Sequence, residues 1–352
     1  MMGRGIPIRY HNAALFKGIP PLPQRLELLT AWLHQTLGSP DFSLEPASGD
    51  ASFRRYFRVR HNGQTLIAMD APPEKEDCGP YIHVAEAFLA LGLHVPQILA
   101  QNLPQGFLLL SDLGTRLYLP ELNESSVDRL YGDALGALAT LQACGPRDDE
   151  LPPYDHTLLL REMMLFPDWY LEQHRNVQLS TAQRTVLNAS FDHLAQVALE
   201  QPRVCAHRDY HSRNLMITPA NNPGILDFQD AVIGPVTYDL VSLLRDAYIA
   251  WPRARVEDWV RGYHELALQS GILQEENEQA FLRWFDLMGV QRHLKVVGIF
   301  ARLNHRDGKP GYLNDIPRVY GYIMDVVPRY PELAALHALL LELNLEIEAV
   351  AG

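Results

Sequence analysis

The segment His207-Arg208-Asp209-Tyr210-His211-Ser212-Arg213-Asn214 decides the fold of this 352-residue chain. It places an aspartate and an asparagine five residues apart on one polar loop, and the apolar run Leu215-Met216-Ile217 that follows predicts a short strand. Thirteen residues after Asn214 comes Asp227-Phe228, at the end of a second apolar run. A loop and its neighbouring strand therefore bring together three side chains with hard oxygen atoms, which are the ligands that Mg²⁺ prefers.

These three side chains suit one kind of chemistry, the transfer of a phosphoryl group. That reaction needs an acceptor hydroxyl held in line and the phosphate charge neutralised, with little covalent help from the protein. We predict Asp209 as the catalytic base and Asn214 and Asp227 as the ligands of Mg²⁺. The spacing H-R-D-x-x-x-x-N followed by D-F is that of the catalytic loop and metal element of protein-kinase-like phosphotransferases, which use ATP.

The hydrophobic periodicity predicts an α+β fold of two lobes. Residues 1–21 form a loose arm, residues 22–112 a small sheet-rich lobe, and residues 113–352 a larger, mainly helical lobe that contains the catalytic loop. The expected elements of the small lobe are a helix over 24–37, strands over 53–59, 65–69, 95–100 and 106–111, and a helix over 81–91. In the large lobe, helices are expected over 126–143, 157–174 and 181–199 and again beyond Tyr238.

The amino-acid composition limits the classes of partner that we expect for the protein and its expected cellular location. With 30 basic and 42 acidic residues the net charge is −12, so neither nucleic acid nor an anionic membrane is an expected partner. Only three cysteines are present, which favours reduced thiols and a cytoplasmic protein. We expect a monomer or weak dimer that acts on small molecules.

The chain resembles the aminoglycoside-phosphotransferase-like kinases and, more narrowly, is similar to the bacterial N-acetylmuramate/N-acetylglucosamine anomeric kinases of cell-wall recycling. His211 supports the broader likeness, because small-molecule kinases of this type often have histidine two residues after the catalytic aspartate. The strings that carry the narrower likeness are residues 49–58, 69–77, 207–216, 226–231, 238–251 and 288–295. The resemblance implies ATP and Mg²⁺ as cofactors and the sugar 1-phosphate as the product.

The nucleotide side departs from the protein-kinase pattern, because Met69 stands where a phosphate-pairing lysine is expected. Strand alternation puts Arg55 on the same face as Phe57 and Val59, and an arginine on an apolar face needs an anionic partner. Our hypothesis is that Arg55 contacts ATP phosphates or Glu86; the alternative is a bulge that turns it outward. The other residues predicted to bind nucleotide are Gly49, Asp50, Ala51 and Ser52 in a covering turn, and Leu110 and Asp112 at the inter-lobe hinge.

The acceptor side is predicted from charge. Residues 291–309 carry five Lys or Arg against one aspartate, and in a helix one stripe would contain Gln291, Lys295, Gly298, Arg302 and His305. Such a stripe is either a solvated face or a site that balances an anionic acceptor, such as the lactyl carboxylate of N-acetylmuramate. The residues predicted to bind the sugar are His211, Arg213, Asp230, Arg245, Asp246, Gln291 and Lys295.

Two other functions stay open at this point. One is a different small-molecule kinase, acting on an aminoglycoside, choline or an amino acid. The other is a nucleotide-binding scaffold without catalytic activity, which the missing lysine would suggest. Retention of Asp209, Asn214 and Asp227 favours an enzyme.

Overall fold

The computed structural model describes residues 22–48, 53–147, 150–274 and 277–345. By internal packing the chain forms two units. One ends at Gly79 and resumes over Ile98–Asp112, and the other comprises Pro80–Gln97 and continues from Leu113. None of the helices in the described part combines the length and apolarity that crossing a bilayer requires.

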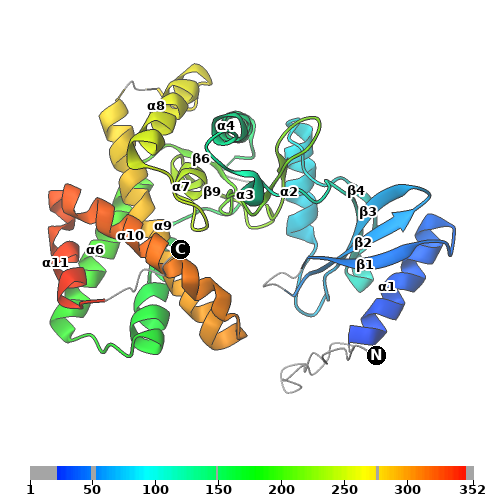
Figure 1. The fold of residues 1–352 in the computed structure, drawn as a ribbon, viewed down its shortest axis with the longest axis horizontal. Helices are drawn as coiled ribbons and strands as arrows, with labels where there is room; N and C mark the ends of the chain where they lie inside the picture. Colours follow the sequence, from blue (N-terminus) through cyan, green and yellow to red (C-terminus); the bar gives the residue numbers. More distant parts are fainter. Residues whose placement is uncertain (1–21, 49–52, 148–149, 275–276, 346–352) are drawn as a thin grey trace, which may run out of the picture. The chain divides into compact units, whose positions relative to one another are not determined.

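The first unit is a five-stranded antiparallel sheet with one helix on it (Figure 1). The strand order is β1-β2-β3-β5-β4. Asn62 and Gly63 both have positive φ (48° and 76°), the conformation of a two-residue hairpin turn between twisted strands. The elements are α1 (Leu22–Leu37), β1 (Ser43–Ser48), β2 (Arg55–His61), β3 (Gln64–Asp70), β4 (Ile98–Asn102), η1 (Leu103–Gln105) and β5 (Phe107–Ser111).

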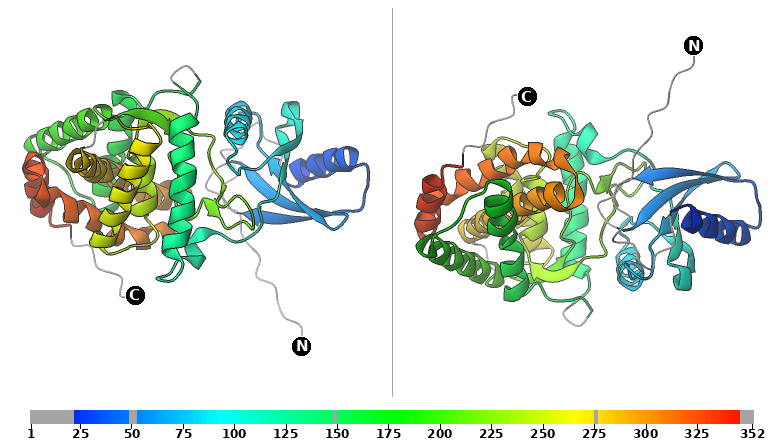
Figure 2. Two further views of the ribbon diagram at one scale, coloured as in Figure 1. Left: turned by 90° about the horizontal axis from the view of Figure 1, so that it is seen from above. Right: turned by 90° about the horizontal axis from the view of Figure 1, so that it is seen from below.

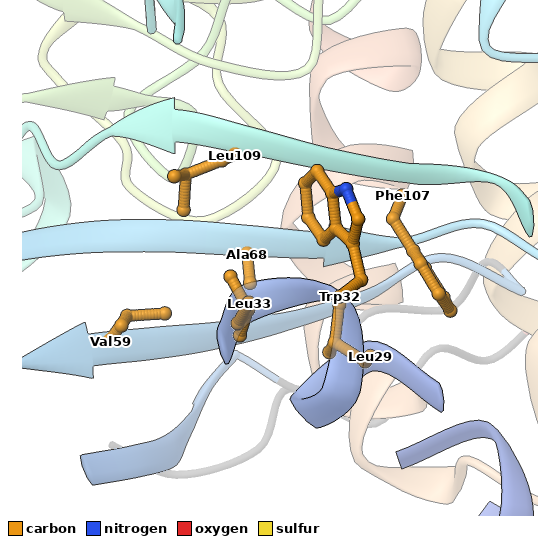
Figure 3. Close-up of a cluster of buried hydrophobic side chains, with 7 residues drawn as sticks. All are labelled: Leu29, Trp32, Leu33, Val59, Ala68, Phe107 and Leu109. Carbon is orange, nitrogen blue, oxygen red and sulfur yellow. The ribbon is translucent and has the colours of Figure 1, made fainter. Parts of the chain in front are cut away.

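Helix α1 lies along one face of this sheet in all three views (Figures 1 and 2). Its buried residues pack on side chains from β2, β3 and β5 (Figure 3). Because side chains alternate across a strand, Val59, Ala68 and Leu109 can all point to α1 while their sequence neighbours point away. The cluster consists of Leu29, Trp32, Leu33, Val59, Ala68, Phe107 and Leu109.

The second unit is mainly helical. Its bounds are α2 (Gly79–Ala90), α3 (Tyr118–Glu121), α4 (Val127–Cys144), α5 (His156–Met163), η2 (Phe166–His174), α6 (Thr181–Leu199), β6 (Arg203–Ala206), β7 (Leu215–Met216), β8 (Gly224–Ile225), β9 (Val232–Pro235), α7 (Tyr238–Leu244), α8 (Arg253–Gln269), α9 (Glu278–Asp307), η3 (Pro310–Asp315), α10 (Ile316–Val326), η4 (Val327–Arg329), η5 (Pro331–Leu333) and α11 (Ala334–Glu342). The long helix α9 packs against α6, α7, α10 and η2 (Figure 2). A Cβ on Gly298 would lie 2.3 Å from the Leu165 backbone, so glycine is needed where α9 meets the start of η2.

Two features differ from the sequence-based expectation. Strand β1 was not predicted, because Ser43–Ser48 alternates weakly and contains Pro46. Segment 80–97, assigned to the sheet-rich lobe, groups with the helical unit instead. The physical reason is aromatic packing: the ring centroids of Tyr81 and Phe88 on α2 lie 4.9 Å and 5.7 Å from that of Phe228.

Candidate active site

The catalytic loop follows strand β6 and is held from below by one buried carboxylate. Asp239, at the start of α7, accepts hydrogen bonds from the backbone N–H groups of His207 (2.6 Å) and Arg208 (2.9 Å). Arg208 has a φ of +75°, a conformation that costs energy for a residue with a side chain. The two hydrogen bonds to Asp239 fix this turn, so Asp239 has the structural role that its Tyr-Asp-Leu context indicates.

A second carboxylate anchors the side chain of Arg208. Glu162 on α5 forms ion pairs with Arg208 and, at 3.0 Å, with Lys295 of α9. Glu162 also accepts a hydrogen bond from the Tyr154 hydroxyl. Burial alone would raise the pKa of Glu162, but the charges of Lys295 and Arg208 outweigh it and lower the pKa. Glu162 is therefore ionised and ties the catalytic loop to helix α9.

The Asp209 carboxylate, in contrast, accepts no hydrogen bond from any residue that the structure describes. Its backbone N–H donates to His207 Nδ1 (3.2 Å) and its carbonyl accepts from Asn214 Nδ2 (3.0 Å), so the backbone is fixed while the side-chain oxygens are available. Burial would raise the pKa of Asp209, but nearby cations, led by Lys295, lower it below the ordinary value. The Asp209 carboxylate is therefore ionised, and its oxygen atoms are available to a ligand.

Asn214 and Asp227 lie side by side next to this base. Asn214 Nδ2 is 3.3 Å from Asp227 Oδ2, and Gln229 Nε2 donates to Asp227 Oδ1 at 2.8 Å. Asp227 has a φ of +64°, another strained position of the kind that gathers at functional sites. Gln229, where protein kinases have glycine, thus orients the Asp227 carboxylate.

These residues fit a magnesium ion that is shared with phosphates. The amide nitrogen of Asn214 is used by the Asp209 carbonyl, which leaves Asn214 Oδ1 for a cation beside the Asp227 carboxylate. The Oε1 atom of Gln229 is buried, has no hydrogen-bond partner among the residues that the structure describes, and adds a third oxygen nearby. No group of three or more His, Cys, Asp or Glu able to hold a metal occurs among the described residues. Proteins usually bind Mg²⁺ through one or two carboxylates together with the phosphates of the substrate.

Of the residues predicted to bind the sugar, His211 and Arg213 lie on the catalytic loop itself. His211 Nδ1 is buried and unpartnered within the described part of the chain, and burial lowers the pKa of His211, so its ring is neutral at pH 7. Arg213 is exposed and lies over the Tyr248 ring. Asp230 is also exposed, and its carbonyl accepts a 3.3 Å hydrogen bond from Arg208.

The other four are buried and have partners inside the unit. Asp246 accepts the Ser212 backbone N–H (2.9 Å) and so braces the loop. Arg245 pairs with Asp325 at 3.2 Å, and Gln291 Nε2 lies 3.4 Å from the Tyr154 hydroxyl. Lys295 donates to the Tyr238 hydroxyl (2.9 Å) in addition to pairing with Glu162. The stripe on α9 is helical as expected, but at Gln291 and Lys295 it is neither a solvated face nor an uncompensated charge.

Of the residues predicted for the nucleotide, the structure describes Arg55, Leu110 and Asp112 in the first unit and Glu86 in the second. Arg55 does lie on the α1 face of the sheet, but its anionic partner is Asp70. Glu86, on α2, is exposed. Met69 points to the opposite face from Arg55, because it is paired with Tyr56 across the ladder. Arg55 therefore does not take the place of a lysine at Met69.

On that opposite face Asp112 accepts two hydrogen bonds from Arg58, at 2.7 Å and 3.1 Å. Leu110, directly across the ladder from Ile67, is buried. The turn Gly49-Asp50-Ala51-Ser52 and the arm 1–21 lie outside the described residues.

Sequence reasoning missed three site residues. Glu162 lies 46 positions from Arg208 and belongs to no recognisable motif, and Tyr238, 30 positions away, was used only as part of the family string 238–251. Gln229 was not predicted as a site residue, although its position two residues after Asp227 could have identified it as a partner of that carboxylate.

The chain is similar to known kinases over most of its length. The chain is 48% identical over 337 residues to the N-acetylmuramate/N-acetylglucosamine kinase of Pseudomonas putida, covering 93% of this chain and 98% of that protein. The enzyme of the same name from Neisseria meningitidis is 45% identical over 334 residues, covering 94% and 99%.

Among solved structures, an ethanolamine kinase of Plasmodium vivax has the same fold with a TM-score of 0.60 at 11% identity, covering 88% of this chain and 90% of that one. The predicted two-lobed kinase-like fold is thereby confirmed. Residues 43–285 match the model of the phosphotransferase enzyme family. This chain belongs to the phosphotransferase enzyme family.

Proposed function

We propose that this protein transfers the γ-phosphate of ATP to the anomeric hydroxyl of N-acetylmuramate and N-acetylglucosamine, giving the sugar 1-phosphates. The observation that carries the proposal is the Asp209 carboxylate, ionised and without a hydrogen-bond partner in the described chain, on the loop that also positions Asn214 beside Asp227. The names of the curated relatives support the choice of sugar.

In this reaction Asp209 accepts the proton of the sugar hydroxyl. The oxygen of that hydroxyl forms a bond to the γ-phosphorus, and the bond from this phosphorus to ADP breaks. An anomeric hydroxyl is more acidic than an ordinary alcohol, so a weak base such as a carboxylate suffices. The hydrogen bond from Asn214 Nδ2 to the Asp209 carbonyl (3.0 Å) fixes the base relative to the metal ligands. Mg²⁺ held by Asn214 and Asp227 would neutralise the phosphate charge.

For the nucleotide we propose contacts by the backbone around Leu110 and Asp112 and by the turn Gly49–Ser52. The Arg58–Asp112 ion pair (2.7 Å) supports this choice, because it fixes the end of β5. Arg55 and Glu86 are weaker candidates, since Arg55 has Asp70 as its partner. We place the enzyme in the cytoplasm, as a monomer or weak dimer that returns cell-wall amino sugars to metabolism.

The test is ATP consumption measured with a panel of amino sugars, aminoglycosides and choline. We expect turnover with N-acetylmuramate and N-acetylglucosamine, and none with the alditols made by reducing their anomeric carbons. Turnover of an alditol would reject the anomeric assignment. Turnover of choline or an aminoglycoside alone would identify another small-molecule kinase, and ATP binding without any turnover would identify a silent scaffold.

A further inference from the structure

Arg213 differs from the other cations near the catalytic loop in how it is held. Its guanidinium carbon lies 4.5 Å from the centroid of the Tyr248 ring and 5.7 Å from that of Tyr312. The two tyrosines are joined through Phe300, with centroid distances of 6.0 Å and 5.3 Å. We call Tyr248, Phe300 and Tyr312 the aromatic wall. Stacking on it fixes the plane of the guanidinium and leaves N–H donors at its edge.

Charge balance also separates Arg213 from its neighbours. Lys295 and Arg245, the other cations predicted for the acceptor, have Glu162 and Asp325 as partners at 3.0 Å and 3.2 Å. Arg213 has no carboxylate within ion-pair distance in the part of the chain that the structure describes. Burial would lower the pKa of Arg213, but Tyr248 and, to a smaller extent, Tyr312 and Asp315 raise it. Asp315 itself pairs with Arg318 at 2.6 Å. Arg213 is therefore a fixed, exposed cation whose charge is open to a ligand.

The aromatic wall contacts the loop that carries Asp209. His211, two residues after Asp209, has its ring edge against Tyr248 with a centroid distance of 5.5 Å. Arg213 itself is next to Asn214, whose side chain contacts Asp227. Asp209 and Arg213 are thus side chains of the same short loop, four residues apart.

We propose that Arg213 is a carboxylate subsite that recognises the lactyl group of N-acetylmuramate and sets the preference for this acid over the neutral N-acetylglucosamine. The inference rests on the proposed function and deepens it. An anionic acceptor must approach Asp209, Asp227 and the ATP phosphates, all of the same charge sign, so a cation at the acceptor end offsets the repulsion. A neutral acceptor has no such need.

The experiment compares Arg213→Gln with Arg255→Gln for both sugars. Arg255 is a matched control, because it also lies over two aromatic rings, Trp251 and Trp259 (5.4 Å and 5.2 Å), but pairs with acids on α4 and just before it. We expect Arg213→Gln to raise KM for N-acetylmuramate about ten- to a hundredfold, the range for a charge-assisted hydrogen bond. KM for N-acetylglucosamine and kcat for both sugars should change less than about threefold. Arg255→Gln should change neither KM.

Two further measurements make the result specific. The methyl ester of N-acetylmuramate should have a high KM with the wild type and lose the difference from the free acid in Arg213→Gln. Arg213→Lys, which keeps the charge, should recover part of the acid preference. An equal loss for both sugars, or an unchanged ratio of their KM values, overturns the subsite. If the wild type turns over neither sugar, the proposed function itself fails, which is a separate outcome.

Discussion

Two aspartates, the buried Asp70 in one unit and the half-buried Asp209 in the other, have arginine or lysine nearby and yet differ in how their oxygens are used. Asp70 on β3 is fully buried, and its two oxygens are taken by Arg25, with Nε at 2.9 Å, and by Arg55. Asp209 has cations near it that lower its pKa but none that bonds to its carboxylate in the described chain. A carboxylate whose two oxygens are both bonded to guanidinium groups stabilises the fold. A carboxylate whose pKa is lowered by cations that do not bond to it keeps its oxygens available to a substrate.

The largest expected effect is that of Asp209→Asn. The amide keeps the shape but cannot accept the proton, and general-base catalysis commonly contributes about 10²–10⁴ in rate. We expect kcat to fall at least about a hundredfold while ATP binding and the melting temperature stay near those of the wild type. The measurement is steady-state turnover together with nucleotide titration and thermal unfolding. Retention of more than a tenth of the activity would remove Asp209 as the base.

Asp70→Asn should show the reverse pattern. Removing one partner of a buried ion pair leaves the others uncompensated and typically costs about 3–5 kcal/mol. We therefore expect a lower free energy of unfolding in a denaturant titration, with kcat of the folded fraction within about threefold of the wild type. If the variant is as stable as the wild type but inactive, Asp70 belongs to the reaction and the contrast between the two aspartates is wrong.

Whether the sequence predicts the role of each aspartate depends on how far along the chain its partners lie. Asp209, Asn214 and Asp227 are recognised because phosphoryl transfer fixes their types and spacing on one loop and the next strand. Asp70 looks like an ordinary strand residue, because its partner Arg25 is 45 positions away and the helix that carries it must first dock on the sheet. Glu162 was missed for the same reason, since Lys295 is 133 positions away. Functional residues that are close together in the sequence can be predicted from it, whereas ion pairs that form only through tertiary packing cannot.

Arg55→Ala tests the Asp70 ion pair whose arginine we first assigned to ATP. Arg25 still pairs with Asp70 in this variant and still donates to the Gln105 carbonyl (2.7 Å). We expect a loss of about 1–3 kcal/mol in the free energy of unfolding, the usual range for a hydrogen bond to a charged group. KM for ATP should stay within about threefold. A KM raised tenfold or more at unchanged stability would return Arg55 to the phosphates.

The smallest effect is expected at Lys295, which acts on Asp209 without bonding to it. The pKa of Asp209 is lowered in the wild type, because nearby cations, led by Lys295, outweigh burial, so this carboxylate is ionised at neutral pH. Lys295→Met removes the leading positive charge and raises this pKa. Because the base is inactivated as protons are added, the acid limb of the kcat/KM profile must move to higher pH.

The profile should be measured from pH 4 to 8 with neutral N-acetylglucosamine as acceptor, so that titration of the substrate does not interfere. Near pH 7 the rate should fall less than about threefold, because most of the base is still ionised there. Lys295→Arg keeps the charge beside Glu162 and should restore the wild-type limb. A loss in Lys295→Met that is equal at every pH would mean that Lys295 only supports the fold through Glu162 and Tyr238. Other groups would then lower the pKa of Asp209. A cation that does not bond to a carboxylate would have to lie closer than Lys295 does to change the pKa of that carboxylate.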